Sequence, residues 1–270
     1  MVDLKGKPIL ITGASSGIGA ATARLCAKAG MPVLLAARRV DRLEALAEEL
    51  RASGAQAHPI VCDVNDAAAC ERAVDQCVST FGSIYAVFAN AGYGFEAPVL
   101  ERSDDQFREL LETNFFGSMH VVRPASAHML HAGQGHILFC SSCLSKIGLP
   151  FYSAYCMSKA AQDYAARALR HELRSQGVFV SSVHPTSTST EFFDKSKAAS
   201  TGMRVDLSGR KAFMHPPEKV ARNVVACLRK PRGEVWTTTS LRLGLGLAVM
   251  FPGLTDRVLR RMARKRGQSL

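Results

Sequence analysis

A tyrosine and a lysine one helical turn apart are the first residues whose types and spacing could do chemistry. Tyr155 and Lys159 lie near the start of a predicted helix, and the four-residue spacing places the phenol and the ammonium on one face. A free tyrosine has a pKa of about 10 and is a poor base at neutral pH. We expect the neighbouring cation to lower that pKa, which makes proton exchange with a hydroxyl or carbonyl feasible. Taken alone, the same spacing also fits an exposed helical pair without chemistry.

Two further polar residues could assist such a proton transfer. Ser142 follows a predicted strand, and its hydroxyl could hydrogen-bond a substrate oxygen on which negative charge develops. Asn114 lies inside a long predicted helix beside Phe115 and Phe116, where a weak helix former requires a polar partner. A buried amide that is merely satisfied by hydrogen bonds is the simpler interpretation of Asn114.

A glycine-rich turn joins the first predicted strand to the first predicted helix. Glycines there allow a positive φ and a close approach of the backbone to a pyrophosphate, and the helix N-terminus offers N–H groups to the phosphates. The spacing is G-x-x-x-G-x-G rather than the G-x-G-x-x-G of the usual dinucleotide fingerprint. The residues predicted to contact a dinucleotide here are Gly13, Ser15, Ser16, Gly17, Ile18 and Gly19.

The same turn also fits the nucleophile elbow of a serine hydrolase. Gly13-Ala-Ser15-Ser-Gly17 matches G-x-S-x-G, and Ser15 would then attack an acyl carbon with His184 as its base. An elbow normally follows most of its sheet, whereas this turn follows the first strand, so we disfavour this interpretation. A tight turn without any ligand is the third alternative.

The end of the second predicted strand indicates which dinucleotide would bind. Ala36 and Ala37 are followed there by Arg38 and Arg39, with no carboxylate to bind a free ribose. Two guanidinium groups favour the 2′-phosphate of NADP(H) over NAD(H), because they form bidentate, charge-assisted hydrogen bonds with phosphate. The alternative is that both arginines are solvated surface charges. Asp63, after the third strand, could cap the next helix or meet an adenine amino group.

Apolar strand-like runs alternate with helix-like runs along most of the chain. The predicted strands cover residues 8–12, 32–36, 58–62, 84–89, 136–140, 178–184 and 234–238. The predicted helices cover residues 17–30, 40–53, 65–80, 103–131, 153–176 and 217–228. This order predicts a single α/β domain with a doubly wound parallel sheet over residues 1–240. The long polar segment 186–215 is predicted to be a loop that covers the site, because ligands bind beyond the carboxyl ends of such strands.

Composition and charge restrict the function further. The 270 residues are 47% hydrophobic and 21% charged, as in an ordinary globular protein. The net charge is +11, but residues 257–266 contain six basic residues and no acidic one, so over half of the excess lies near the C-terminus. Because no aromatic stacking platform accompanies these residues, we do not expect a nucleic-acid partner.

The cysteines point to a reducing compartment. The chain has eight of them, and its start lacks the apolar core of a secretory signal, so we expect reduced thiols in the cytoplasm. Cys140-x-x-Cys143 cannot supply four zinc ligands, and we expect no metal site.

The segment 241–270 is predicted to be a basic amphipathic extension. Val258, Leu259 and Met262 lie opposite several arginines on a helix. Such a helix could lie on an anionic membrane surface, pack on a partner subunit or fray in solvent. A spanning helix is not expected, because Arg242, three glycines and Pro252 interrupt the apolar stretch 241–254.

Taken together and in order, the motifs closely resemble those of the short-chain dehydrogenases/reductases. The matching series is Thr12-Gly13-x-x-x-Gly17-x-Gly19, Asp63-Val64, Asn90-Ala91-Gly92, Asn114, Ser142 and Tyr155-x-x-x-Lys159. The resemblance implies a Rossmann-type fold and an oxidoreductase that transfers a hydride between NADP(H) and a carbonyl or secondary alcohol. It implies that Tyr155 is the general acid/base and that Ser142 orients and polarises the substrate oxygen. Lys159 would bind the nicotinamide ribose and tune Tyr155, and Asn114 would hold a water in a proton relay.

The resemblance also implies the remaining cofactor contacts. Asp63 and Val64 would meet the adenine, and Asn90, Ala91 and Gly92 would line the adenosine side. Pro185, Thr188 and Thr190 would lie near the nicotinamide and phosphates. In two places the chain departs from the family pattern. Thr186 replaces the glycine that usually follows Pro185, and Ser16 stands where some NADP(H) users have a basic residue.

Substrate and assembly are expectations of the same kind. An apolar pocket for a lipophilic compound, such as a steroid, a retinoid or a long-chain keto compound, is predicted from the loop 143–152 and from other segments expected near the same rim. The residues are Leu144, Ile147, Leu149, Pro150, Phe151 and Tyr152 in the loop, and Tyr93, Phe95, Phe192, Phe193, Phe213 and Met214 elsewhere. Ordinary packing under a lid is the alternative. Family members usually form homodimers or homotetramers through two long helices, here near 103–131 and 153–176. A non-catalytic dinucleotide sensor of the same fold is the main alternative to an enzyme.

Overall fold

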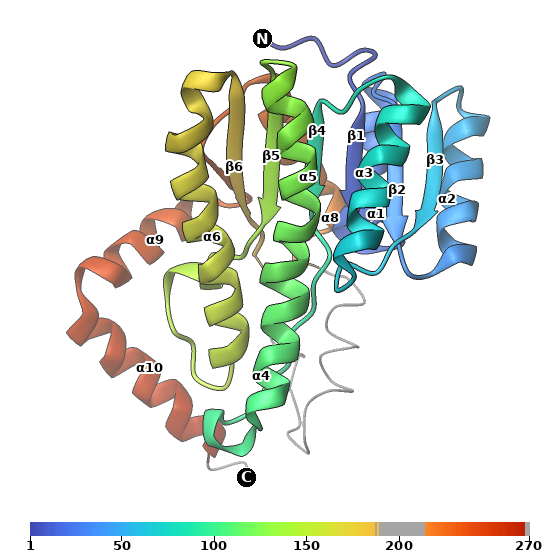
Figure 1. Cartoon of the computed structure of the whole chain (residues 1–270). Helices are drawn as coiled ribbons and strands as arrows, with labels where there is room; N and C mark the ends of the chain where they lie inside the picture. The colour runs from blue at the N-terminus through green and yellow to red at the C-terminus, as the bar shows by residue number, and fades with distance from the viewer. Residues whose placement is uncertain (187, 189–213, 268–270) are drawn as a thin grey trace.

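A single parallel sheet organises the chain. A computed structural model describes residues 1–186, 188 and 214–267, with side chains up to residue 264 (Figure 1). Seven described strands pair in parallel in the order β3-β2-β1-β4-β5-β6-β7. Their bounds are β1 (Ile9–Thr12), β2 (Val33–Ala37), β3 (Ala57–Val61), β4 (Ala86–Ala89), β5 (Gly135–Cys140), β6 (Val178–His184) and β7 (Glu234–Trp236). The predicted doubly wound, Rossmann-type α/β sheet is confirmed.

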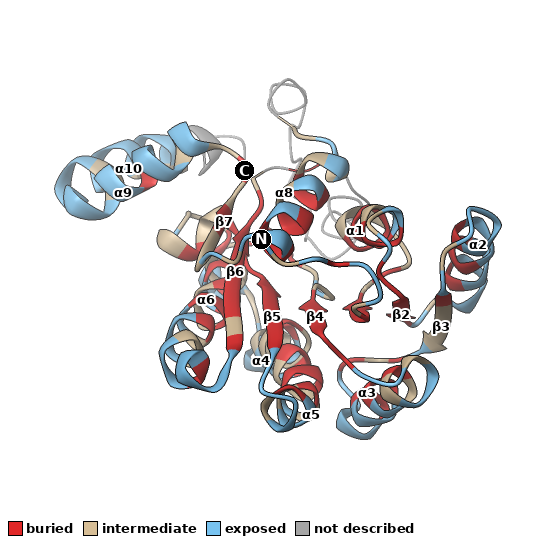
Figure 2. Ribbon diagram, turned by 90° about the horizontal axis from the view of Figure 1, so that it is seen from above, coloured by how far each residue is buried: buried red, intermediate tan, exposed pale blue. Residues whose placement is uncertain are grey.

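The strands are buried on both faces, which explains their continuous apolar sequences. Figure 2 shows helices on either side of the sheet. On one side α1 (Gly17–Lys28), α2 (Val40–Ala52) and α8 (Pro217–Arg229) contribute to one apolar core. On the other side α3 (Ala67–Phe81), α5 (Gly117–His131) and α6 (Ser153–Leu173) contribute to a second core. The two cores therefore cover the two faces of the sheet, and the loops that follow the strands meet at its carboxyl edge.

The predicted long helix 103–131 contains a wider turn in its middle. It consists of α4 (Asp104–Leu111), a π-helical turn η2 (Glu112–Phe116) and α5. In η2 the N–H of Gly117 bonds to the carbonyl of Glu112, five residues back, instead of four. Ser103 and Gln106 form a capping box at the start of α4. The helix therefore begins where the sequence predicted, but Asn114 lies in its irregular turn.

Element ends differ slightly from the predictions. Asp66 caps α3 by accepting a hydrogen bond from the N–H of Ala69, so this helix begins two residues later than predicted. α6 ends at Leu173 and continues as the short 3₁₀ turn η4 (Arg174–Gln176). Two further 3₁₀ turns, η1 (Val99–Glu101) and η3 (Cys143–Lys146), lie in loops near the carboxyl edge.

The C-terminal extension forms two helices, α9 (Thr239–Met250) and α10 (Pro252–Gly267). In both views they project beyond the rest of the molecule on the β7 side (Figures 1 and 2). No helix among the described residues is long and apolar enough to span a bilayer. The predicted covering loop 186–215 falls outside the described residues except for 186, 188, 214 and 215.

Candidate active site

A cavity of about 780 Å³ opens at the carboxyl ends of the strands. It runs from the glycine turn after β1, past the loops after β4 and β5, to the end of β6. Three of the four predicted catalytic residues line it, namely Ser142, Tyr155 and Lys159. The other predicted residues that line it are Gly13, Ser15, Ser16, Gly17, Ile18, Arg38, Arg39, Asp63, Val64, Asn90, Ala91, Gly92, Pro185 and Thr188. Gly19 and Asn114 are buried and do not line the cavity, and Thr190 is outside the described residues.

The glycine turn is locked against the end of β4. Gly13 has a φ of +65°, and a Cβ there would lie 3.0 Å from the Cα of Ala91. A Cβ on Gly19 would collide with the carbonyl oxygen of Gly13. The Thr12 hydroxyl oxygen accepts hydrogen bonds from the backbone N–H groups of Asn90 (3.0 Å) and Ala91 (3.1 Å). The turn therefore has no room for a side chain at Gly19, and at Gly13 a side chain would be both tightly packed and strained by the positive φ.

The two arginines occupy different positions at this end of the cavity. Arg39 donates from Nη2 to the hydroxyl oxygens of Ser16 (2.7 Å) and Ser15 (3.0 Å). Arg38 is exposed and lies 3.5 Å from the carboxylate of Asp63. The structure thus brings Asp63 together with Arg38, a contact that the sequence did not predict.

The serine hydrolase interpretation is wrong. Ser15 accepts hydrogen bonds from Arg39, whereas His184 lies at the end of β6, with β4 and β5 between that strand and β1. An activated serine needs its base within hydrogen-bond reach, and these two residues are not brought together.

Ser142 and Tyr155 meet in the middle of the cavity. The backbone N–H of Leu144 donates to the Ser142 hydroxyl oxygen (3.1 Å), which fixes that side chain at the start of η3. Burial raises the pKa of Tyr155, and a hydrogen bond with the Ser142 side chain offsets only part of the rise. The expectation of a lowered phenol pKa is therefore wrong for this structure, because desolvation of the phenolate outweighs the hydrogen bond with Ser142.

The ammonium of Lys159 is buried behind the phenol. Its Nζ donates to the carbonyl oxygen of Cys140 (2.8 Å) and to Oε1 of Gln162 (2.9 Å), and it lies 5.7 Å from the ring centroid of Tyr155. Burial lowers the pKa of Lys159 to about 8. The group is therefore still mainly charged at pH 7, but its hydrogen bonds go to the backbone and to an amide rather than to the phenol.

Asn114 is fully buried, and both its side-chain amide and its backbone carbonyl form hydrogen bonds. Its Nδ2 donates to the carbonyl oxygen of Tyr93 (2.9 Å) and to the Ser158 hydroxyl (2.8 Å), and its Oδ1 accepts from the N–H of Tyr93 (3.0 Å). Its carbonyl oxygen accepts from Nε2 of Gln162 (2.7 Å) and from the Ser118 hydroxyl (2.8 Å). These contacts fit the simpler interpretation, a satisfied amide that joins η2 to α6. The relay role stays a prediction.

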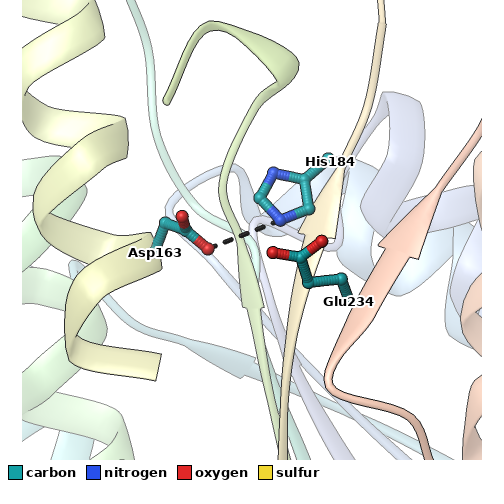
Figure 3. Close-up of side chains that lie close together, drawn as sticks. All are labelled: Asp163, His184 and Glu234. Carbon is teal, nitrogen blue, oxygen red and sulfur yellow. Dashed lines mark ion pairs between the residues drawn. The ribbon is translucent and has the colours of Figure 1, made fainter. Parts of the chain in front are cut away.

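A buried ionic cluster lies farther along α6, at Asp163, on the helix face that also carries Tyr155 and Lys159. Asp163 follows Lys159 by one turn, and its Oδ1 lies 3.4 Å from Nε2 of His184 (Figure 3). Asp163, His184 and Glu234 have the types and spacing of metal ligands. Lys146, however, places its ammonium 2.6 Å from Asp163 and 3.0 Å from Glu234. A lysine side chain thus already supplies a cation between the two carboxylates.

This cluster reaches Ser142 through His184. The Nδ1 of His184 lies 3.0 Å from the carbonyl oxygen of Ser142, and its ring stacks on Trp236 with centroids 4.4 Å apart. The N–H of Cys143 donates to the carbonyl oxygen of Pro185 (3.0 Å). These bonds hold the peptide group that follows Ser142 to the end of β6.

The end of the cavity away from the glycine turn is apolar in part. Tyr93, Leu144, Leu149 and Tyr152 line it as predicted, and Met262 of α10 adds a residue from the C-terminal extension. The predicted residues that do not line it are Phe95, Ile147, Pro150, Phe151 and Met214. Phe192, Phe193 and Phe213 lie outside the described residues.

Comparison with known proteins identifies the family. The sequence model of the short chain dehydrogenases matches residues 7–201. The chain belongs to the short-chain dehydrogenase/reductase family. It is therefore an oxidoreductase of a family that acts on alcohol and carbonyl groups with a nicotinamide dinucleotide, as the motifs predicted.

Relatives and solved structures extend over most of the chain. The bovine dehydrogenase/reductase SDR family member 7B is 30% identical over 97% of this chain and 82% of its own length. A fatty acyl-CoA reductase of Mycobacterium tuberculosis is 34% identical over 73% of this chain and 68% of its own length. A Burkholderia phymatum family member in complex with NAD has a TM-score of 0.84 at 25% identity, covering 94% and 97% of the two chains. An alcohol dehydrogenase from Thermococcus sibiricus with 5-hydroxy-NADP has a TM-score of 0.74 at 29% identity, covering 85% and 95%.

Sequence reasoning missed several residues that support the site of this short-chain dehydrogenase. They are Lys146, Ser158, Gln162 and Asp163, which bond Lys159, Asn114 or the cluster around His184. A signal was available, because Gln162 and Asp163 repeat the face of Lys159 three and four residues later. Polar residues on that face of a helix that packs on a sheet indicate buried hydrogen bonds.

Replacing Gly19 by alanine tests the fixed shape of the glycine turn. The added Cβ would collide with the carbonyl of Gly13, so we expect the free energy of unfolding to fall by about 1–3 kcal/mol and dinucleotide binding to weaken. Urea unfolding and titration calorimetry with NADPH measure the two effects. Gly246→Ala is the matched control, because a Cβ there meets open space. Unchanged stability and binding in Gly19→Ala would show that the turn can relax.

The ionic cluster predicts a loss of stability in acid. Burial alone would raise the pKa of Glu234, but hydrogen bonds from Trp236 and Lys146 outweigh it and lower that pKa to about 2. The unfolded chain therefore binds this proton more readily than the folded one, and the stabilisation present above pH 4.5 is lost as the pH falls toward 2. We expect Glu234 to contribute on the order of 2 kcal/mol to this loss.

Urea unfolding between pH 7 and pH 2.5 measures the acid effect. Glu234→Gln should flatten the pH dependence, whereas Glu44→Gln, at an exposed site on α2, should leave it as in the wild type. An equally steep acid loss in Glu234→Gln would assign the effect to other carboxyl groups.

Proposed function

We propose that this chain is an NADP(H)-dependent oxidoreductase that transfers a hydride between the nicotinamide and a lipophilic carbonyl or secondary alcohol. One observation carries the proposal. The side chains of Ser142 and Tyr155 are hydrogen-bonded to each other in a cavity that also contains the buried Lys159 ammonium and, at its other end, the glycine turn. Family membership supports the reaction type, and the residues below support its finer features.

The cavity fits a dinucleotide. The first turn of α1 contains no acidic side chain, and Ser16 does not cap it with its own side chain, so the N–H groups of this turn are suited to an anion. The pyrophosphate would lie on the glycine turn, the adenosine beside Asp63, Val64 and residues 90–92, and the nicotinamide ribose at Tyr155 and Lys159. Pro185 and Thr188 would contact the nicotinamide. When bound, the nicotinamide supplies or accepts the hydride.

The protein's own residues would handle the proton. Because its pKa is raised, the phenol of Tyr155 is protonated at neutral pH and can donate to a carbonyl oxygen. The Ser142 hydroxyl can donate a second hydrogen bond to the same oxygen as negative charge develops. The phenolate that remains lies near the Lys159 ammonium, whose positive charge stabilises it. In the reverse direction the phenolate would accept the alcohol proton.

The arginines support a preference for NADP(H). Arg39 is held at Ser15 and Ser16, Arg38 lines the same end of the cavity, and Ala37 stands where a carboxylate would favour a free ribose. Asp63 pairs with Arg38, but both side chains are exposed, so water screens this pair and leaves the guanidinium able to bind a phosphate.

The apolar end of the cavity supports a lipophilic substrate. Leu144, Leu149 and Met262 offer no hydrogen-bonding groups there, whereas Tyr93 and Tyr152 combine apolar rings with hydroxyls. The fatty acyl-CoA reductase among the relatives has a substrate of this chemical class by its name.

Assembly and location are proposed on similar grounds. Phe116, Met157 and Tyr164 are exposed on the long helices through which we expect a homodimer or homotetramer to form. All eight cysteines are free thiols and seven are buried, which supports a reducing compartment such as the cytoplasm. Residues 1–240 would be the catalytic domain, with 241–270 as an extension.

Tyr155→Phe tests the assigned acid. With a panel of lipophilic aldehydes and ketones, we expect the wild type to oxidise NADPH and the variant to lose a factor of about 10²–10⁴ in rate. NADPH binding should persist, because only the hydroxyl is removed. Tyr164→Phe on the same helix is the matched control and should keep the wild-type rate, since its side chain is 68% exposed. Retained turnover in Tyr155→Phe contradicts the mechanism, and NADPH binding without turnover of any carbonyl by the wild type indicates a sensor.

Arg38→Gln and Arg39→Gln test the cofactor preference. A charge-assisted hydrogen bond is worth about 1.5–3 kcal/mol, so the ratio of kcat/KM for NADPH over NADH should fall at least tenfold in the double variant. The kcat/KM for NADH should change little. Arg222→Gln, at an exposed site on α8, is the control. A wild-type enzyme that prefers NADH refutes the proposed preference.

A further inference from the structure

The C-terminal arm, residues 239–264, is attached to the rest of the molecule by few contacts. α9 follows β7 and packs on η3, and α10 packs on α9. Both helices extend beyond the body in the two views (Figures 1 and 2). Within α9 only Leu245 is buried. Most of the arm's surface is therefore available to another partner.

Each helix of the arm has an exposed apolar stripe. On α9, Leu243, Leu247 and Met250 recur at spacings of four and three, with exposed fractions of 66%, 56% and 71%. On α10, Leu254 and Val258 are 61% and 50% exposed and also lie four residues apart. Side chains at these spacings share a helix face. Exposed apolar surface of this kind normally marks an interaction site.

Arginines flank the stripe on α10. Arg257, Arg260, Arg261 and Arg264 are all exposed, and Asp256 is the one acidic residue between 239 and 264. An apolar stripe beside a basic one matches a surface that has an apolar interior and an anionic boundary. A second copy of the arm is a poor match, because a two-fold contact would bring the basic stripes of both copies into one interface with a single carboxylate, Asp256, from each arm.

We propose that the arm binds the surface of an anionic lipid bilayer. α9 and α10 would lie along the surface, with Leu243, Leu247, Leu254 and Val258 in the acyl boundary and the arginines at lipid phosphates. None of the described helices is long and apolar enough to cross the bilayer, so the contact is peripheral. This binding requires neither the cofactor nor the proposed reaction.

Vesicle sedimentation of the full-length protein tests the proposal. We expect binding to vesicles of phosphatidylcholine with phosphatidylglycerol, little binding to pure phosphatidylcholine, and weaker binding at 0.5 M salt. Leu247→Ser/Leu254→Ser should lower the partition coefficient at least about 30-fold, because it removes two buried apolar side chains. Arg257→Gln/Arg261→Gln should lower it about 30-fold, since a basic residue near an anionic surface contributes ~1 kcal/mol.

The controls distinguish lipid binding from misfolding and from self-association. Arg222→Gln/Arg229→Gln removes two exposed charges from α8 and should bind vesicles like the wild type. Circular dichroism and NADPH binding show that each variant is folded. The proposal is overturned if the wild type does not bind the anionic vesicles. It is also overturned if the α8 control loses as much vesicle binding as Arg257→Gln/Arg261→Gln. Light scattering that shows Leu247→Ser/Leu254→Ser dissociating an oligomer would also overturn it, because the stripe would then join two copies.

Discussion

The burial of one ammonium group at the carboxyl edge of the sheet constrains the rest of the site. A charged lysine is costly to remove from water, so Lys159 needs oxygen acceptors on every accessible side. Cys140 and Gln162 supply them, and Gln162 is held in turn by the carbonyl of Asn114. The end of β5, helix α6 and the turn η2 are thereby fixed relative to one another. The phenol of Tyr155 takes its position from this arrangement.

A second constraint acts through the same helix. Tyr155, Lys159 and Asp163 are spaced by four residues on α6, so one helical register positions the phenol, the ammonium and the ionic cluster at once. Asp163 faces His184, which bonds the backbone of Ser142. A buried ion pair adds little net stability to the fold, but removing one of its partners strongly destabilises the protein, because the other charge is left buried and unpaired. The cluster therefore contributes mainly to the placement of the serine beside the tyrosine.

The sequence predicted the elements well because its strongest signals are local. Apolar strands, helix caps and the glycine turn depend on neighbouring residues, and the structure places Gly13, Ser142 and Tyr155 around one cavity as expected. What could not be predicted depends on burial and on distant contacts. Spacing showed that Lys159 would be near Tyr155, but not that desolvation would raise the pKa of the phenol. No local pattern paired Arg38 with Asp63 either.

The π-helical turn at Asn114 has a consequence for the register of the long helix. An α-helix advances by about 100° per residue, so the extra residue in η2 rotates all of α4 relative to α5 by that angle. Deleting one residue there would let the helix run on regularly while turning the whole of α4 away from its present neighbours. Its buried Leu110 would then leave the small core that it shares with Phe95 and with Ala154 at the start of α6. Insertions and deletions within 112–116 are therefore tolerated far less than substitutions on the exposed side of α4.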